Sequence, residues 1–172
     1  MEPADRTLLV VRHAKSDWGT GLPDVERPLN KRGRRDAPAV GRWIADQAFP
    51  VDAAVVSPAE RTRQTWSLLA ASGELAVAPA FDRGIYLGEA DELAEAVRCL
   101  EPSARCAVLV GHAPGCPDLV EWLTAGAGSA EALQRMRAKF PTSGVAAIAL
   151  DGDWTDVEPA SGVLLDFQVC RG

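Results

Sequence analysis

The sequence has 172 residues, with 18 Lys and Arg against 24 Asp and Glu, which gives a formal net charge of −6. This net negative charge argues against a protein that binds the phosphate backbone of a nucleic acid, because such binding needs a net basic face. With 47% hydrophobic and 24% charged residues the chain can bury a core, which excludes the disordered and collagen-like classes. The length fits one domain, so we expect a single domain over residues 1–172.

The sequence also indicates where in the cell the protein is located. No stretch approaches the roughly 20 apolar residues that a transmembrane helix needs. The opening segment Met1–Asp5 is acidic, whereas a secretory signal begins with basic residues. We therefore expect a cytoplasmic protein without a membrane or nucleic-acid partner.

The four cysteines form no Cys-x-x-Cys pair and have no neighbouring histidine that would complete a zinc site. We interpret them as buried free thiols, and a disulfide or a redox role is the alternative. The pattern predicts neither a metal site nor a cofactor. The cysteines are Cys99, Cys106, Cys116 and Cys170.

Short apolar runs alternate with longer amphipathic stretches, an order typical of strands that lead into helices. Near-continuous apolar strands indicate burial on both faces, so we predict a three-layer α/β sandwich with about six mostly parallel strands and helices on both faces. The predicted strands are Thr7–Val11, Ala53–Val56, a weaker one at Leu75–Ala78, Ala107–Val110, Val145–Leu150 and Leu164–Val169. The predicted helices lie at about Lys31–Ala48, Ala59–Ala71, Glu92–Leu100 and Pro117–Ala125.

Capping residues mark the first two helices. Asn30 is a good N-cap for the first helix. The segment Ser57–Glu60 reads as a capping box with Pro58 at the first helical position, so we expect the second strand to turn into a helix within about two residues. The segment Ser16–Pro28, which contains Trp18, has no periodicity and is predicted to be a surface loop that contacts substrate.

The chain has only two histidines, and each lies immediately beyond an apolar strand. His13 follows the first strand, and His112 follows the strand Ala107–Val110 after one glycine. Ligands of open parallel sheets bind at the carboxyl ends of the strands. We therefore expect the two imidazoles to face one site, although a lone histidine in either context would more often be structural.

Two arginines complete this pattern. Arg12 adjoins His13, and Arg61 lies in the first turn of the helix that follows the second strand. Either could be an ordinary surface arginine. Together with the histidines they predict a cationic cup at a helix N-terminus, which suits a tetrahedral anion.

Phosphoryl transfer fits such a cup, because it depends on positioning and on neutralising the charge of the phosphoryl oxygens. A neutral imidazole is also a competent nucleophile when its other nitrogen is held by an acceptor. Either His13 or His112 could accept the phosphoryl group and pass it to water. The residues alone leave that choice open.

Four segments carry these residues in order along the chain: Arg12–Ser16, Glu26–Asn30 with Gly33–Ala37, Ser57–Thr65 and Gly111–Gly115. Together they resemble the histidine phosphatase superfamily, and within it the small SixA-type phosphohistidine phosphatases. The turn Gly152-Asp153-Trp154 also fits that subgroup. The likeness runs from Leu8 to about Phe167.

The resemblance implies that His13 is the nucleophile and that Arg12, Arg61 and His112 bind the phosphoryl group. Arg27 matches a further basic position near the pocket, and pairing with Asp24 or Glu26 is its equally open structural role. Ser16, at the end of the first motif, is a further candidate for substrate binding.

The sequence departs from the family pattern at two positions. Ala113 stands where the family commonly has Asn. Leu87 stands where many members have a Glu general acid. Of the acids that follow closely, Glu89, Asp91 and Glu92, we name Glu89 as the candidate for that acid and as a substrate-binding residue. Acids before and in the first turn of a helix also favour its dipole, and that is the competing interpretation of Glu89.

The missing acid affects the choice of substrate. A departing alkoxide needs a proton, and general acid catalysis contributes ~10²–10⁴-fold. A phosphoryl group on a histidine nitrogen leaves as a much less basic imidazole. The missing acid therefore favours a P–N bond in the substrate. We predict a metal-independent phosphatase with a covalent phosphohistidine intermediate that acts on phosphohistidine in a protein.

Other functions remain open. The first alternative is a phosphatase of the same superfamily for small phosphate esters. The second is an adaptor that binds phosphate without turnover, and a mutase is the least favoured because so short a chain has little with which to close the pocket. The sequence does not specify the oligomeric state.

Overall fold

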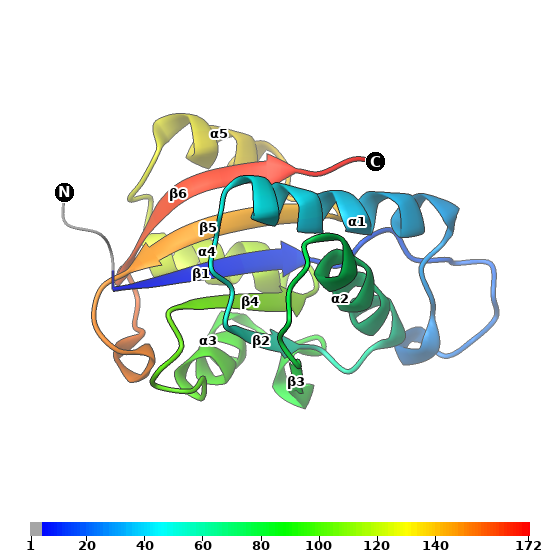
Figure 1. The fold of residues 1–172 in the computed structure, drawn as a ribbon, viewed down its shortest axis with the longest axis horizontal. Helices are drawn as coiled ribbons and strands as arrows, with labels where there is room; N and C mark the ends of the chain where they lie inside the picture. The colour runs from blue at the N-terminus through cyan, green and yellow to red at the C-terminus, as the bar shows by residue number, and fades with distance from the viewer. Residues whose placement is uncertain (1–4) are drawn as a thin grey trace.

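The computed structural model describes residues 5–172, so most of the acidic opening segment lies outside the described residues. A six-stranded sheet in the order β3-β2-β4-β1-β5-β6 forms the centre of the molecule (Figure 1). The strands are β1 (Arg6–Arg12), β2 (Ala53–Val56), β3 (Ala80–Phe81), β4 (Cys106–Gly111), β5 (Gly144–Leu150) and β6 (Gly162–Val169).

The sheet is mostly parallel. β1 pairs with β4, β4 with β2 and β2 with β3 in parallel, whereas β5 pairs antiparallel with both β1 and β6. The carboxyl ends of β1, β2 and β4 therefore lie at the same edge of the sheet, where the long loop after β1 also lies (Figure 1).

Helices cover both faces of the sheet, which confirms the predicted sandwich. One apolar core contains residues of the first two helices, and a second contains residues of the other three. None of the helices in the described part of the chain is long and apolar enough to span a membrane. The helices are α1 (Lys31–Asp46), α2 (Glu60–Ser72), α3 (Ala90–Arg98), α4 (Gly115–Thr124) and α5 (Ala130–Ala138).

The central strand β1 shows why its apolar run is continuous. Leu8 and Val10 belong to the core under α3, α4 and α5, whereas Leu9 and Val11 belong to the core under α1 and α2. All four side chains are fully buried. Because successive strand residues point to opposite faces, a strand covered on both sides needs an apolar residue at every position.

Two predicted elements differ from the structure. The segment Leu75–Ala78 is not a strand, because Leu75 and Val77 pack against the core without joining the sheet. The edge strand is instead the two-residue β3. The sequence analysis also missed α5, although Ser129 caps it and Leu133 and Met136 bury one side.

The predicted capping box after β2 is wrong. α2 begins at Glu60, and its N-cap Ala59 has no side-chain cap. The Ser57 hydroxyl lies 2.8 Å from His112 Nε2, so it serves another part of the molecule. The Asn30 cap of α1 is confirmed, because its side chain accepts a hydrogen bond from the Gly33 N–H.

The cysteines agree with the sequence analysis except at one position. All four are free thiols, and Cys106, Cys116 and Cys170 are buried. Cys99 is exposed, since it follows α3 as its C-cap and faces solvent.

Candidate active site

The two histidines meet because their strands are neighbours. In the parallel pair of β1 and β4, Arg12 lies opposite Gly111, so the next residue of each strand is a histidine. The His13 N–H donates to the Gly111 carbonyl at 3.0 Å. The ring centroids of His13 and His112 are 5.2 Å apart. The register of two strands thus places both imidazoles at one point of the sheet edge.

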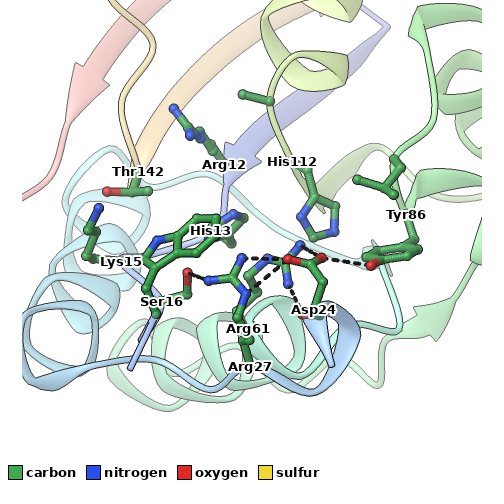
Figure 2. Close-up of a pocket in the computed structure, with 13 residues that line it drawn as sticks. Arg12, His13, Lys15, Ser16, Asp24, Arg27, Arg61, Tyr86, His112 and Thr142 are labelled. Atoms are coloured by element: carbon green, nitrogen blue, oxygen red, sulfur yellow. Dashed lines mark hydrogen bonds and ion pairs between the residues drawn. The ribbon is translucent and has the colours of Figure 1, made fainter. Parts of the chain in front are cut away.

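A cavity of about 350 Å³ opens at this edge, and Figure 2 shows the side chains that surround it. Six of the seven residues proposed from the sequence line it, and Glu89 does not. The lining residues are Arg12, His13, Lys15, Ser16, Trp18, Asp24, Arg27, Arg61, Tyr86, Leu87, His112, Ala113 and Thr142. Over residues 5–172, no three His, Cys, Asp or Glu side chains gather as a metal site.

The protonation of His13 is set by its neighbours. Its Nδ1 lies 2.7 Å from the Ala14 carbonyl oxygen, which can only accept, so Nδ1 carries the proton and Nε2 the lone pair. Burial lowers the pKa of His13 to about 3, opposed by the hydrogen bond to Ala14 and reinforced by the charge of Arg61. At neutral pH the ring is therefore a neutral base with an available nitrogen.

His112 is held through its opposite nitrogen. Its Nε2 contacts the Ser57 hydroxyl, and its Nδ1 is buried without a partner. Burial is the main cause that lowers the pKa of His112 to about 3, followed by the nearby His13. With the Ser57 hydroxyl as donor to Nε2, the Nδ1–H is free to bind an acceptor.

The arginines add further unpaired donors. The Nε atoms of Arg12 and Arg61 are buried without partners, like Nδ1 of His112. Arg12 uses Nη1 to donate to the Phe140 carbonyl at 2.7 Å. Buried donors are normally paired, because an unpaired one costs about 1–3 kcal/mol. Three unpaired nitrogens on residues around one cavity indicate a binding site for an anion with several oxygens.

The loop after β1 contributes Ser16, Trp18 and Arg27. The Arg27 Nη1 donates to the Ser16 hydroxyl at 2.9 Å, and its guanidinium stacks on the Trp18 ring at 3.7 Å. Arg27 also forms an ion pair with Asp24 at 2.8 Å. It therefore lies at the cavity and makes the structural pair with Asp24 as well. Trp18 remains 73% exposed at the mouth of the cavity.

Asp24 and Tyr86 are among the lining residues that the sequence analysis missed as parts of the site. Oδ2 of Asp24 accepts hydrogen bonds from Arg61 Nη2 at 3.0 Å and Tyr86 Oη at 2.7 Å. The Tyr86 hydroxyl and the two arginines hold the pKa of this carboxyl well below its usual range. The available signal was slight: an acid three residues before Arg27, and the single tyrosine of the chain.

The segment after His13 is fixed from two sides. The Ala14 N–H donates to the Thr65 hydroxyl on α2 at 3.0 Å. On the other side Gly33, in the first turn of α1, packs against the Lys15 backbone so closely that a Cβ would overlap the Lys15 carbonyl oxygen. Gly33 is thus required for this approach, which holds the residues after β1 in place.

Glu89 lies outside the cavity lining. It is the N-cap of α3, and its N–H donates to the Glu92 carboxylate at 2.9 Å. This placement matches the helix-capping interpretation and corrects its assignment as a substrate-binding residue. Leu87 lines the cavity instead and is 68% exposed.

Comparison with known proteins adds independent findings. A family model of the Histidine phosphatase superfamily (branch 1) matches residues 8–97. An uncharacterized protein of Mycobacterium tuberculosis is 36% identical over 162 residues, which cover 94% of this chain and all of the relative.

Solved structures are similar over nearly the whole chain. A Nakamurella multipartitia protein, provisionally described as phosphohistidine phosphatase SixA, has a TM-score of 0.82 and 30% identity over 95% of both chains. A protein histidine phosphatase SixA complexed with tungstate has a TM-score of 0.78 and 19% identity, over 95% of this chain and 96% of the other. At that identity the second likeness concerns the fold alone.

Proposed function

The chain belongs to the histidine phosphatase superfamily and is a phosphatase, and we propose that it hydrolyses phosphohistidine on a protein through a covalent intermediate. In this proposal His13 is the nucleophile, Arg12 and Arg61 hold the phosphoryl oxygens, and His112 donates to one of them. Arg27 and Ser16 shape the adjoining wall. The unpaired nitrogens of Arg12, Arg61 and His112 support this assignment.

The reaction proceeds in two displacements. Nε2 of His13 attacks phosphorus while the bond to the leaving nitrogen breaks, and the bonding electron pair departs with the leaving group. Water then attacks the phosphorus of phospho-His13, the P–N bond breaks, and orthophosphate leaves. The hydrogen bond from Nδ1 to Ala14 supports this role, because it keeps the lone pair on Nε2.

The observation that carries the choice of substrate is that no protonated carboxyl group lines the cavity among the described residues. Asp24 is the one carboxyl group among the described residues that line the cavity. Its lowered pKa keeps it ionised at neutral pH, so it cannot act as a general acid. A phosphohistidine protonated at its distal nitrogen releases neutral imidazole and needs no such donor.

The mouth of the cavity supports a protein substrate. Trp18 and Leu87 line the cavity and are 73% and 68% exposed, so apolar surface borders the charged cup. Exposed apolar side chains next to a polar site are typical of surfaces that bind another protein. A small, highly charged metabolite would gain nothing from this border.

A substrate panel tests the proposal. The purified protein is offered a phosphohistidine peptide and phosphoimidazole, with alkyl and aryl phosphates as the P–O members. We expect the highest kcat/KM for the P–N compounds, and an acid-labile phosphoenzyme after rapid quenching. Faster hydrolysis of alkyl esters would favour the small-ester phosphatase, and tungstate binding without any turnover would favour the adaptor.

A further inference from the structure

One wall of the cationic cavity carries a negative charge. The charged residues that line the cavity are Arg12, Lys15, Arg27 and Arg61, which are cationic, and Asp24, which is anionic. The Asp24 side chain is 45% exposed, so its carboxylate borders the space that a substrate enters. A site that binds phosphate gains no affinity from such a group, because like charges repel. Asp24 pairs with Arg27 and Arg61, and its exposed position raises the question of what else its charge does.

The hydrogen bonds of Asp24 exclude direct proton chemistry. Oδ1 accepts from Arg27 Nε at 3.0 Å and Nη2 at 2.8 Å, and Oδ2 accepts from Arg61 Nη2 at 3.0 Å and Tyr86 Oη at 2.7 Å. A carboxylate offers about four lone-pair positions, and these four donors use them. No position remains for an N–H or O–H of a substrate. What the group still presents to the cavity is its charge.

Asp24 occupies one side of the cavity only. Figure 2 shows its carboxylate next to Arg61 and Tyr86, well separated from Lys15 and Thr142 across the His13 ring. The unpaired donors of Arg12, Arg61 and His112 can satisfy the phosphoryl oxygens themselves. A second anionic group on the substrate, on the side of Asp24, would meet this carboxylate instead of a free cation.

We propose that Asp24 is a specificity-determining residue that disfavours substrates with a second negative charge beside the phosphoryl group. The inference rests on the proposed function and extends it to the leaving group, which must be neutral or cationic. An imidazole or imidazolium meets this condition, whereas an acid phosphate ester does not. Discrimination of this kind uses like-charge repulsion against the wrong ligand.

Binding of two matched phosphonates tests the charge effect without relying on turnover. Phenylphosphonate and 4-carboxyphenylphosphonate differ by one carboxylate, and calorimetry gives the Kd of each. In the wild type we expect the carboxylate to weaken binding. In Asp24→Asn, which keeps the shape of the side chain, we expect the ratio of the two Kd values to move roughly tenfold toward the charged ligand.

Glu26→Gln is the matched control. Glu26 belongs to the same short segment, is exposed and does not line the cavity, so its loss removes the same charge elsewhere. We expect this variant to leave the ratio of the two Kd values at the wild-type value. A similar change in both variants would show only a general effect of net charge and would overturn the proposal.

The remaining outcomes separate the two proposals. If Asp24→Asn weakens or tightens binding of both phosphonates equally, Asp24 positions Arg61 or competes with phosphate, and charge selection is wrong. If the ratio moves as expected but no phosphorylated compound is hydrolysed, the proposed function fails and the inference about binding stands. If neither phosphonate binds to either protein, both fail.

Discussion

An arginine lies at each end of β1, and the two guanidinium groups differ in how many of their N–H groups donate hydrogen bonds within the fold. At the amino end Arg6 is buried, and its terminal nitrogens donate to the carbonyls of Gly152 and Pro102 and to the carboxylate of Asp153. At the carboxyl end Arg12 donates to a single carbonyl, that of Phe140. Both terminal nitrogens of Arg6 are paired within the fold, whereas only one terminal nitrogen of Arg12 is paired.

This difference separates stability from function on one strand. The terminal nitrogens of Arg6 bind acceptors at the amino end of β1, and removing the side chain leaves these acceptors unpaired. In the proposed function, a guanidinium with unused donors beside two neutral imidazoles forms a preorganised anion site, whose partners arrive with the substrate. Variants at the two edges should therefore affect different quantities.

The largest expected effect is at His13, the proposed nucleophile. His13→Asn removes the imidazole, so we expect turnover to fall by at least ~10³-fold and the trapped phosphoenzyme to disappear. Single-turnover assays with phosphoimidazole and acid-labile phosphate after quenching measure this. The free energy of unfolding at neutral pH should hardly change. A labelled phosphoenzyme in this variant would assign the nucleophile elsewhere.

Next in size is Arg61. Arg61→Ala removes a donor to the phosphoryl oxygens and should lower kcat by ~10²–10³-fold with the fold intact. Steady-state kinetics and circular dichroism check both parts. A folded variant with nearly normal kcat would remove this residue from the mechanism.

Arg6→Ala is the matched variant at the opposite edge. It leaves two carbonyls without a donor, so we expect the free energy of unfolding to fall by about 1–3 kcal/mol while kcat stays unchanged. The pair with Asp153 adds little, because that side chain is largely exposed. Urea denaturation together with the same kinetic assay gives both values. Loss of activity without loss of stability would contradict the contrast between the two edges.

A fourth prediction concerns pH. Both histidines have a folded-state pKa of about 3 against about 6.5 when unfolded, so the unfolded chain binds more protons between these values. Stability is therefore complete above pH 6.5 and falls as the pH is lowered. At pH 5 each histidine should lower the free energy of unfolding by ~2 kcal/mol.

Denaturation experiments between pH 7.5 and pH 5 measure this loss. Asp24 does not interfere in this range, because its pKa is lowered and its contribution to stability changes only at more acidic pH. The chain has no other histidine. His13→Asn should reduce the slope by about half. An unchanged slope in that variant would mean that His13 does not become neutral on folding.

The smallest expected effect is at Ser57. Its hydroxyl contacts Nε2 of His112 at 2.8 Å and so orients the imidazole ring. Ser57→Ala removes one buried hydrogen bond, worth about 1 kcal/mol, so we expect kcat/KM to fall roughly fivefold to tenfold. Ser57→Thr retains a hydroxyl and should recover part of the loss. Equal kcat/KM in the Ala variant and the wild type would remove the orienting role.

Much of this arrangement could be predicted from the sequence, and the errors have physical causes. The strands with continuous apolar runs were predicted well because burial on both faces leaves a strong signal, as in β1 and β4. The short edge strand β3 was missed since two exposed residues leave no such signal. Ser57 was misread because a serine before a helix usually caps it, whereas here His112 competes for the hydroxyl.

The sequence by itself determined that two histidines and Arg12 would meet at the carboxyl edge, because adjacent parallel strands end on the same side of a sheet. It also determined the two-sided core through its apolar runs. Only the tertiary structure decided that Asp24 would join Arg61 and Tyr86, which lie 37 and 62 residues away along the chain. The loop that carries Asp24 has no periodic pattern, so its contacts depend on where the surrounding helices hold it.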